Sequence, residues 1–240
     1  DGRVDPDELL SRVDERTRVV ALSWVQFASG FRSDLGRIGR ACRERGVLFV
    51  VDAIQGLGAL ELDVERDAVD VLAASAHKWL LGGEGIGLLY VSDRVVERLE
   101  PARVGWTSVE DWIKWSRYDL TYRRGAGRFE CGTLNMFGVY ALGAALELLA
   151  EVGIAEVERQ IRTLTDRLVE GLGERDFDVV SSRRPGEWSG IVAATHPRRT
   201  PDAVARHLRD RGVLVAHRSG RLRVSSHFYN TLDEVERLLS

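Results

Sequence analysis

The sequence predicts an α/β fold, in which a mostly parallel, doubly wound sheet is followed by a small α+β unit. Short apolar runs suited to buried strands alternate with a helical pattern over the first hundred residues. A polar residue, Ser23, Asp52 or Ser75, stands at the end of each of three such runs. Strand–helix–strand order is typical of parallel sheets, whose ligands lie beyond the carboxyl ends of the strands. We therefore expect these three side chains to emerge at one edge of the sheet.

The elements of the predicted sheet follow in order along the chain. Residues 18–23 are a short apolar run, and Ser33 is expected to cap the helix that comes next. Residues 47–51 form a continuous β-branched and aromatic run, as expected for a strand covered on both faces. Two further strands are predicted at residues 69–74 and 86–91.

The pattern changes in the middle of the chain. Between residues 101 and 135, Trp106, Trp112 and Trp115 are mixed with arginine and glycine in irregular order. A long connection of this kind is usually functional or lies at an interface, and we take it as a candidate substrate or dimer wall. Residues 136–150 are apolar on nearly all sides of a helix, so we expect that helix to be buried.

The last part of the chain predicts a small α+β unit, with a domain boundary near residue 152. Residues 154–172 repeat apolar positions at spacings of three and four, which predicts a helix with one apolar stripe. Thr200 is expected to cap a second helix, and Thr231 with Glu234 forms a capping box for the last one. The strands of this unit are expected at residues 177–180, 191–194, 213–216 and 221–225.

Composition narrows the function classes. The hydrophobic content of 44% and charged content of 30% are typical of a soluble globular protein, and the net charge of −3 argues against nucleic acid as a partner. No apolar run approaches the roughly 18 residues of a membrane span. The two cysteines, Cys42 and Cys131, provide neither a disulfide framework nor a metal-ligand spacing, which indicates a cytoplasmic protein without a metal site. The first residues contain no initiator methionine, so we expect a fragment.

Lysine is almost absent, and the exception is informative. Only Lys78 and Lys114 are lysines among 34 basic residues, and the rest are arginines. Unlike arginine, a lysine can lose its proton and form a Schiff base with a carbonyl group. Lys78 lies between an apolar run and a glycine cluster, whereas Lys114 has the surroundings of a surface residue. The structural alternative is that Lys78 is a helix-end charge with a buried aliphatic stem.

Asp52 precedes Lys78 by 26 positions, and both follow predicted strands. A carboxylate and a Schiff-base lysine that face one cavity suit pyridoxal phosphate, because the carboxylate keeps the pyridine nitrogen protonated while the lysine holds the aldehyde. Ser75 and His77 could bind the phosphate. Structural alternatives remain: the aspartate could cap a turn, and the histidine could be packed in the core. The glycines that follow Lys78 lack the pattern of a nucleotide-binding loop, which argues against a generic nucleotide-binding domain.

Four motifs in order resemble one family over nearly the whole chain. Residues 75–90 read SAHKWLLGGEGIGLLY, and residues 50–58 read VVDAIQGLG. The others are RFECGTLN at residues 128–135 and RLRVSSHFYNT at residues 221–231. Together they are similar to the class V aminotransferases, which include cysteine desulfurases, selenocysteine lyases and isopenicillin N epimerase-like proteins.

The resemblance implies a fold-type-I, pyridoxal-phosphate-dependent enzyme that works as a homodimer with shared sites. Residues 1–152 would be the C-terminal part of the large cofactor-binding domain, with the dimer and active-site loop region at residues 101–135, and residues 153–240 the small domain. The sheet in this chain would be partial. The roles that the resemblance implies are a Schiff-base lysine at Lys78, a pyridine-nitrogen partner at Asp52, a ring-hydroxyl neighbour at Gln55, phosphate ligands at Ser75 and His77, a ligand of the partner subunit's phosphate at Thr133, and a clamp for the substrate carboxylate at Arg223.

Two features depart from the family pattern. The segment that supplies the phosphate-binding loop and the ring-stacking residue precedes the region that matches Asp1, and it is not in this chain. Desulfurases also carry a reactive cysteine on a loop ahead of the carboxylate-binding arginine, and the matching residues 216–220 contain none. Cys131 is the remaining candidate for a persulfide carrier, subject to exposure and thiolate stabilisation.

These observations predict a class V aminotransferase-type enzyme that acts at the α-carbon of a small amino acid substrate through a Lys78 Schiff base. One alternative is a cysteine desulfurase or selenocysteine lyase. A second alternative is a truncated, non-catalytic homologue that serves as a dimerisation or binding module, because the front segment of the family is missing.

Overall fold

The structure is a computed structural model that describes residues 2–114, 116 and 119–240. The elements of the first part are α1 (Pro6–Ser11), β1 (Val19–Ser23), α2 (Leu35–Glu44), β2 (Leu48–Asp52), β3 (Val71–Ser75), β4 (Gly87–Val91), α3 (Asp93–Val96), the 3₁₀ helix η1 (Gly125–Phe129) and α4 (Met136–Val152). Those of the second part are α5 (Ile154–Gly173), β5 (Asp178–Val179), β6 (Ile191–Thr195), α6 (Pro201–Asp210), β7 (Ala216–Arg218), β8 (Arg221–Ser225) and α7 (Leu232–Leu239).

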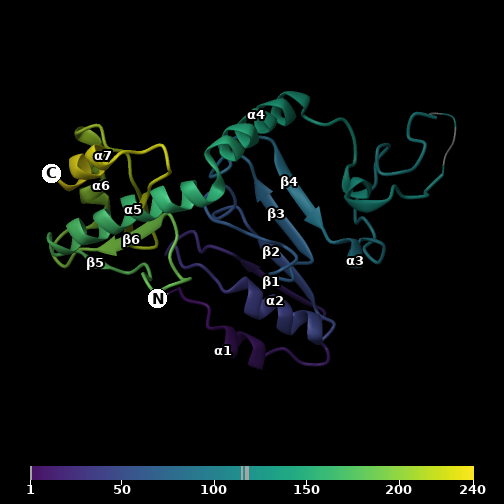
Figure 1. Cartoon of the computed structure of the whole chain (residues 1–240), viewed down its shortest axis with the longest axis horizontal. Helices are drawn as coiled ribbons and strands as arrows, with labels where there is room; N and C mark the ends of the chain where they lie inside the picture. The colour runs from purple at the N-terminus through teal and green to yellow at the C-terminus, as the bar shows by residue number, and fades with distance from the viewer. Residues whose placement is uncertain (1, 115, 117–118) are drawn as a thin grey trace.

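The first sheet has the strand order β1-β2-β3-β4 (Figure 1). β1, β2 and β3 are parallel, and β4 runs antiparallel to β3. The register pairs Ser23 with Asp52 and Asp52 with Ala73, so the ends of the three parallel strands reach the same edge. On β2, Phe49 and Val51 are fully buried, while Leu48 and Val50 are half-buried. The predicted mostly parallel sheet is confirmed, although β2 is less covered on its second face than expected.

Two details of the prediction were wrong. Asp34, not Ser33, caps α2: its carboxylate accepts a hydrogen bond from the N–H of Arg37 at 2.9 Å. The hydroxyl of Ser33 instead donates a hydrogen bond to the main-chain carbonyl of Ser23 at 3.3 Å, which joins the start of the helix to the end of β1. In the second part, the strand expected at residues 213–216 begins only at Ala216.

α4 is far more exposed than its composition predicted. Only Gly138, Leu142 and Leu149 are buried, whereas Phe137 is 92% exposed and Tyr140 is 74% exposed. The helix lies on the β4 side of the sheet (Figure 1), so this chain covers one of its faces and leaves the other uncovered. The sequence therefore predicted the apolar character of α4 correctly and its burial within this chain wrongly.

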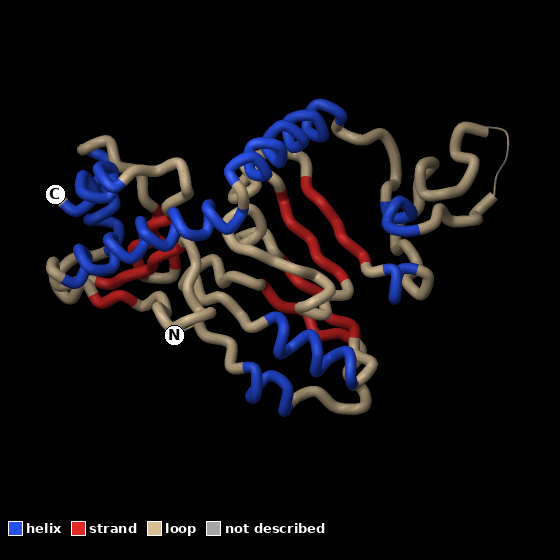
Figure 2. The backbone as a smooth tube through the Cα atoms, viewed as in Figure 1, coloured by secondary structure: helices blue, strands red, loops and turns tan. Residues whose placement is uncertain are grey.

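The connection from α3 to α4 carries the helix η1 and lies beyond β4, at the end of the molecule away from the second sheet (Figure 2). Trp106 and Trp112 pack edge to face there, with ring centroids 5.3 Å apart. They line a cavity of about 770 Å³ together with residues between 104 and 121. Trp115 lies outside the described residues. The role of this region as a substrate or dimer wall stays a prediction.

The second sheet is antiparallel, in the order β5-β6-β8-β7. α5, α6 and α7 pack on it around a core that includes Leu164, Leu168 and Val192. The expected caps are present: Thr200 accepts from the N–H of Ala203, and Thr231 forms a capping box with Glu234. α5 also contributes to the first core, so one helix supports both units. The division into domains near residue 152 stays a prediction.

No single described helix is long and apolar enough to cross a membrane. α4 and α5 satisfy the length and composition requirement only when taken together, and they are bent by 79° at the break between them. Within the described residues, no three or more His, Cys, Asp or Glu side chains form a group that could hold a metal ion.

The loop after β1 is packed directly on β6. Gly30 has a φ of +72°, and a Cβ atom there would lie 2.2 Å from the carbonyl oxygen of Ile191. We expect Gly30→Ala to lower the free energy of unfolding by about 2–4 kcal/mol, because backbone strain and overpacking add. Gly186→Ala is the matched control, since Gly186 has a φ of +79° with open space around it. Urea unfolding of both variants would contradict the packing argument if the two losses were equal.

Candidate active site

The site begins at the edge where the parallel strands end. Asp52 is the last residue of β2 and is exposed. Its Oδ1 atom accepts a hydrogen bond from the N–H of Ile54 at 3.0 Å, and its Oδ2 atom accepts a long one of 3.4 Å from the Ser23 hydroxyl. A carboxylate offers about four acceptor positions, so Asp52 retains acceptor capacity toward a ligand. Its placement at the sheet edge agrees with the expectation from sequence.

The candidate lysine follows the neighbouring strand. Ser75 is the last residue of β3 and is half-buried, and His77 and Lys78 are exposed in the turn behind it. The N–H of Gly82 donates to the carbonyl of Ala76 at 2.9 Å and closes this turn. The turn therefore presents Lys78 from the same sheet edge at which Asp52 ends β2.

A buried hydrogen bond joins the loops that carry these two residues. Gln55, three residues after Asp52, accepts a hydrogen bond from the indole Nε1 of Trp79 at 3.0 Å. Gln55 and Trp79 are 7% and 5% exposed, so the bond is shielded from water. It fixes the chain on either side of the site. The carbonyl group of Gln55 is thus occupied by Trp79.

Arg223 reaches this edge from the second sheet. It lies on β8, and one of its terminal nitrogens donates to the carbonyl of Phe27, in the loop after β1, at 2.9 Å. Its Nε atom is buried and has no hydrogen-bond partner among the described residues. Burial, with a smaller contribution from Arg218, lowers the pKa of the Arg223 guanidinium. A half-buried guanidinium with an unused donor is suited to bind an anionic group.

Thr133 and Cys131 lie apart from these residues in the chain, on the exposed segment between η1 and α4. The Cys131 thiol lies 3.4 Å from the carbonyl oxygen of Arg103 and 3.7 Å from that of Phe129. The contact of Thr133 with the partner subunit's phosphate stays a prediction.

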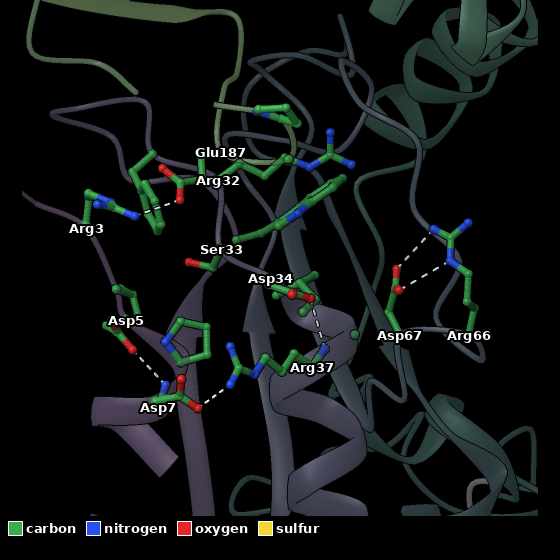
Figure 3. A pocket seen from close by; sticks show the side chains of 18 residues that line it. Arg3, Asp5, Asp7, Arg32, Ser33, Asp34, Arg37, Arg66, Asp67 and Glu187 are labelled. Carbon is green, nitrogen blue, oxygen red and sulfur yellow. Dashed lines mark hydrogen bonds and ion pairs between the residues drawn. The ribbon is translucent and has the colours of Figure 1, made fainter. Parts of the chain in front are cut away.

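A separate cavity of about 560 Å³ lies between the N-terminal segment, the start of α2 and residues 185–187. Figure 3 shows that several of the charged side chains around it pair with one another. The pairs are Arg3 with Glu187, Arg37 with Asp7, and Arg66 with Asp67. None of the candidate catalytic residues lines this cavity. We therefore place the candidate site at the sheet edge instead.

Comparison with known proteins identifies the family of the chain. The sequence matches the family Aminotransferase class-V over residues 1–238. A probable cysteine desulfurase from Pyrococcus abyssi is 34% identical, over 92% of this chain and 58% of that protein. The isopenicillin N epimerase of Amycolatopsis lactamdurans is also 34% identical, over 97% of this chain and 62% of that protein. The chain belongs to the class-V aminotransferase family.

Solved structures of class-V aminotransferase relatives confirm the fold. The apo structure of the cysteine desulfurase from Thermococcus onnurineus NA1 matches with a TM-score of 0.89 and 31% identity, covering 99% of this chain and 62% of that one. The cystine C–S lyase C-DES, in a mutant with glycine covalently linked to its pyridoxal phosphate cofactor, matches with a TM-score of 0.87 and 25% identity, covering 98% of this chain and 62% of that one. The chain therefore spans about three fifths of the length of these relatives.

Class-V aminotransferases are pyridoxal-phosphate-dependent enzymes, and the residues at the sheet edge fit that cofactor. Asp52 supplies an exposed carboxylate with free acceptor positions, and Lys78 supplies an exposed amine. Ser75 and His77 add a hydroxyl and an imidazole between them. A pyridine nitrogen, an aldehyde and a phosphate each find a suitable group in this set.

Two residues of the site were missed in the sequence. His227 is 5% exposed, and its Nε2 atom lies 3.0 Å from the carbonyl oxygen of Trp79. Its Nδ1 atom accepts a hydrogen bond from the N–H of Phe228 at 2.8 Å, so the proton of the neutral ring is on Nε2. The second residue is Trp79, whose place directly after Lys78 could have drawn attention to it. Nothing in the sequence connects it with a histidine 148 positions later.

We expect the protein to become less stable as the pH decreases, because of His227. Burial is the main cause that lowers the pKa of its imidazole below the ordinary 6.5. The unfolded chain therefore binds this proton more readily than the folded chain does. The free energy of unfolding has its full value above about pH 6.5 and decreases as the pH falls toward the lowered pKa. Urea unfolding between pH 7.5 and 5.5 should show this slope, and His227→Gln should flatten it. A carboxyl such as Asp14, whose pKa lies below 3.8, titrates outside this window. An equal slope in both proteins would contradict the assignment.

Proposed function

We propose that the whole protein is a pyridoxal-phosphate-dependent enzyme that acts at the α-carbon of an amino acid. The observation that carries this proposal is the position of Asp52 and of the Lys78 turn at one sheet edge, tied together by the bond between Gln55 and Trp79. Pyridoxal phosphate, when bound, supplies an electron sink for the bond that breaks at the α-carbon. We place the protein in the cytoplasm on the evidence of its two free cysteines.

The residues of this chain divide the work. The Lys78 amine would hold the cofactor through its aldehyde group, and it is the group that would take and return the proton of the substrate α-carbon. The Asp52 carboxylate would accept a hydrogen bond from the protonated pyridine nitrogen, and Gln55 would lie beside the ring hydroxyl. Ser75 and His77 would hold the phosphate.

Arg223 completes the substrate site. Its guanidinium is positioned by the carbonyl of Phe27, and its buried Nε atom has no hydrogen-bond partner among the described residues. A carboxylate can engage two guanidinium donors side by side, which orients the amino acid as well as binding it. We assign Arg223 to the carboxylate of the substrate.

We further propose that the protein works as a homodimer. The uncovered face of α4 presents Phe137 and Tyr140 to solvent. Large apolar side chains exposed together on one helix are typical of an interface. Thr133 is exposed on the segment that leads into α4, and we assign it to the phosphate in the partner subunit's site.

The two lysines allow a direct test. The whole protein would be loaded with pyridoxal phosphate and reduced with borohydride, and its peptides would be mapped by mass spectrometry. We expect the pyridoxyl group on Lys78 and none on Lys114, which is exposed and paired with Asp111 at 2.8 Å. A pyridoxyl group on Lys114 alone, or on neither lysine, would refute the proposed site. Absence of any bound cofactor would favour a non-catalytic dimerisation or binding module.

The second candidate function is cysteine desulfuration, because several relatives carry that name. The turn between β7 and β8 argues against it. Ser219 and Gly220 form a two-residue turn with positive φ at both positions. The connection between β7 and β8 is therefore too short to be a cysteine-bearing loop ahead of Arg223. If Cys131 carried a persulfide, sulfide release from cysteine would be lost in Cys131→Ala. Cys42→Ala is the control, since that thiol is fully buried.

A further inference from the structure

Trp79 lies where the two units of the chain meet. A Cβ atom on Gly58, which has a φ of +95°, would lie 2.4 Å from the carbonyl oxygen of Trp79. A Cβ atom on Gly190, directly before β6, would lie 2.5 Å from the Cη2 atom of its indole ring. Glycine is thus required on both sides, in the loop after β2 and at the start of β6. The tryptophan is held between the first sheet and the second.

Two polar groups of Trp79, the indole N–H and the main-chain carbonyl, are used by different units. The indole N–H donates to Gln55 in the first unit at 3.0 Å, and the main-chain carbonyl accepts from His227 in the second at 3.0 Å. The rings of Trp79 and His227 are 5.2 Å apart at an interplanar angle of 31°. The backbone of the residue next to Lys78 is therefore fixed from the side of the second sheet.

His227 is itself held in one orientation. The main-chain N–H of Phe228 donates to the Nδ1 atom of His227. The main-chain N–H of His227 donates to the side-chain oxygen of Asn230 at 2.9 Å. Asn230 in turn donates to Glu234 in the capping box of α7 at 3.1 Å. A chain of hydrogen bonds thus runs from the start of α7 to the Lys78 turn.

We propose that Trp79 and His227 are positioning residues for Lys78, through which the C-terminal unit sets the placement of the cofactor-attaching amine. The inference rests on the proposed role of Lys78. Since neither side chain contacts the reacting atoms, their effect passes through the main chain of the turn. A shift of β8 or α7 would reach Lys78 by the same route, so the unit that carries Arg223 and the turn that carries Lys78 are mechanically coupled.

The test measures attachment of the cofactor, not turnover. The cofactor-free whole protein would be mixed with limiting pyridoxal phosphate and quenched with borohydride at set times, and the pyridoxyl group on Lys78 would be quantified. We expect His227→Leu to slow this attachment about tenfold, because the Trp79 carbonyl loses a buried donor. His227→Gln carries an N–H at similar reach and should retain the parent rate within about threefold. Rescue by glutamine is not expected of a residue that only fills space.

Two further variants complete the design. His196→Leu is the matched control, because His196 also packs against an aromatic ring in the C-terminal unit, that of Phe177 at 4.9 Å, and should leave the rate unchanged. Trp79→Phe keeps a ring but removes the donor to Gln55, and it should slow attachment even if His227→Leu fails to fold. Parent-like attachment in His227→Leu and Trp79→Phe, or equal loss with leucine and glutamine at position 227, would overturn the inference. Failure of the parent to attach the cofactor at Lys78 would instead overturn the proposed function.

Discussion

Lys78→Ala is expected to lower the kcat of the whole protein by about 10²–10⁴-fold, because proton transfer by a positioned side chain is worth that much. The same change removes the only amine that the described chain presents from the sheet edge, since Lys114 lies in the segment beyond β4. Cofactor absorbance characteristic of covalent attachment should disappear together with the activity. Folding should persist, because Lys78 is exposed.

Two variants make this result specific. Lys114→Ala removes the other lysine and should leave kcat unchanged. Lys78→Arg keeps the positive charge, but a guanidinium stays protonated and cannot attack an aldehyde, so it should be as inactive as the alanine variant. Activity of Lys78→Arg near that of the parent would mean that charge alone is required at this position, and the proposed chemistry would be wrong. Circular dichroism and urea unfolding would verify that each variant is folded.

The placement of the candidate site residues in the fold was predictable from sequence to the extent that it depends on strand ends. Ser23, Asp52 and Ser75 each follow an apolar run, and parallel strands bring such ends together regardless of the loops between them. The capping box of Thr231 and Glu234 was equally predictable, because its two partners are three residues apart. Local spacing and strand order were sufficient for these features.

Features that depend on distant contacts were not predictable. Ser33 is a good capping residue, yet its hydroxyl is taken by the Ser23 carbonyl, and Asp34 caps α2 instead. The bond from His227 to Trp79 joins residues 148 positions apart, and no periodicity reports on it. The burial of α4 failed for a different reason: an apolar helix predicts that something covers it, but not that the cover belongs to the same chain.

Arg223 supplies the second large expected effect. Arg223→Ala should lower kcat/KM for the amino acid substrate roughly 30- to 1000-fold, which corresponds to a loss of about 2–4 kcal/mol of transition-state stabilisation. The reason is that the substrate carboxylate loses a partly desolvated ionic partner. Most of the loss should fall on KM, since the carboxylate is bound in the ground state as well as in the transition state. Arg223→Lys should recover only part of it, because an ammonium cannot form two parallel hydrogen bonds with a carboxylate.

The amine that corresponds to the substrate without its carboxylate separates binding from folding. Parent and Arg223→Ala should process this amine at equal, low kcat/KM, because the guanidinium has nothing to bind in either case. A further drop with the amine would mean that Arg223 acts mainly through its hydrogen bond to Phe27, as a support for the loop after β1. Arg206→Ala, on the exposed face of α6 and paired with Asp202, controls for the loss of one positive charge from the same unit. Equal losses for Arg206→Ala and Arg223→Ala would assign the effect to net charge and remove Arg223 from the substrate site.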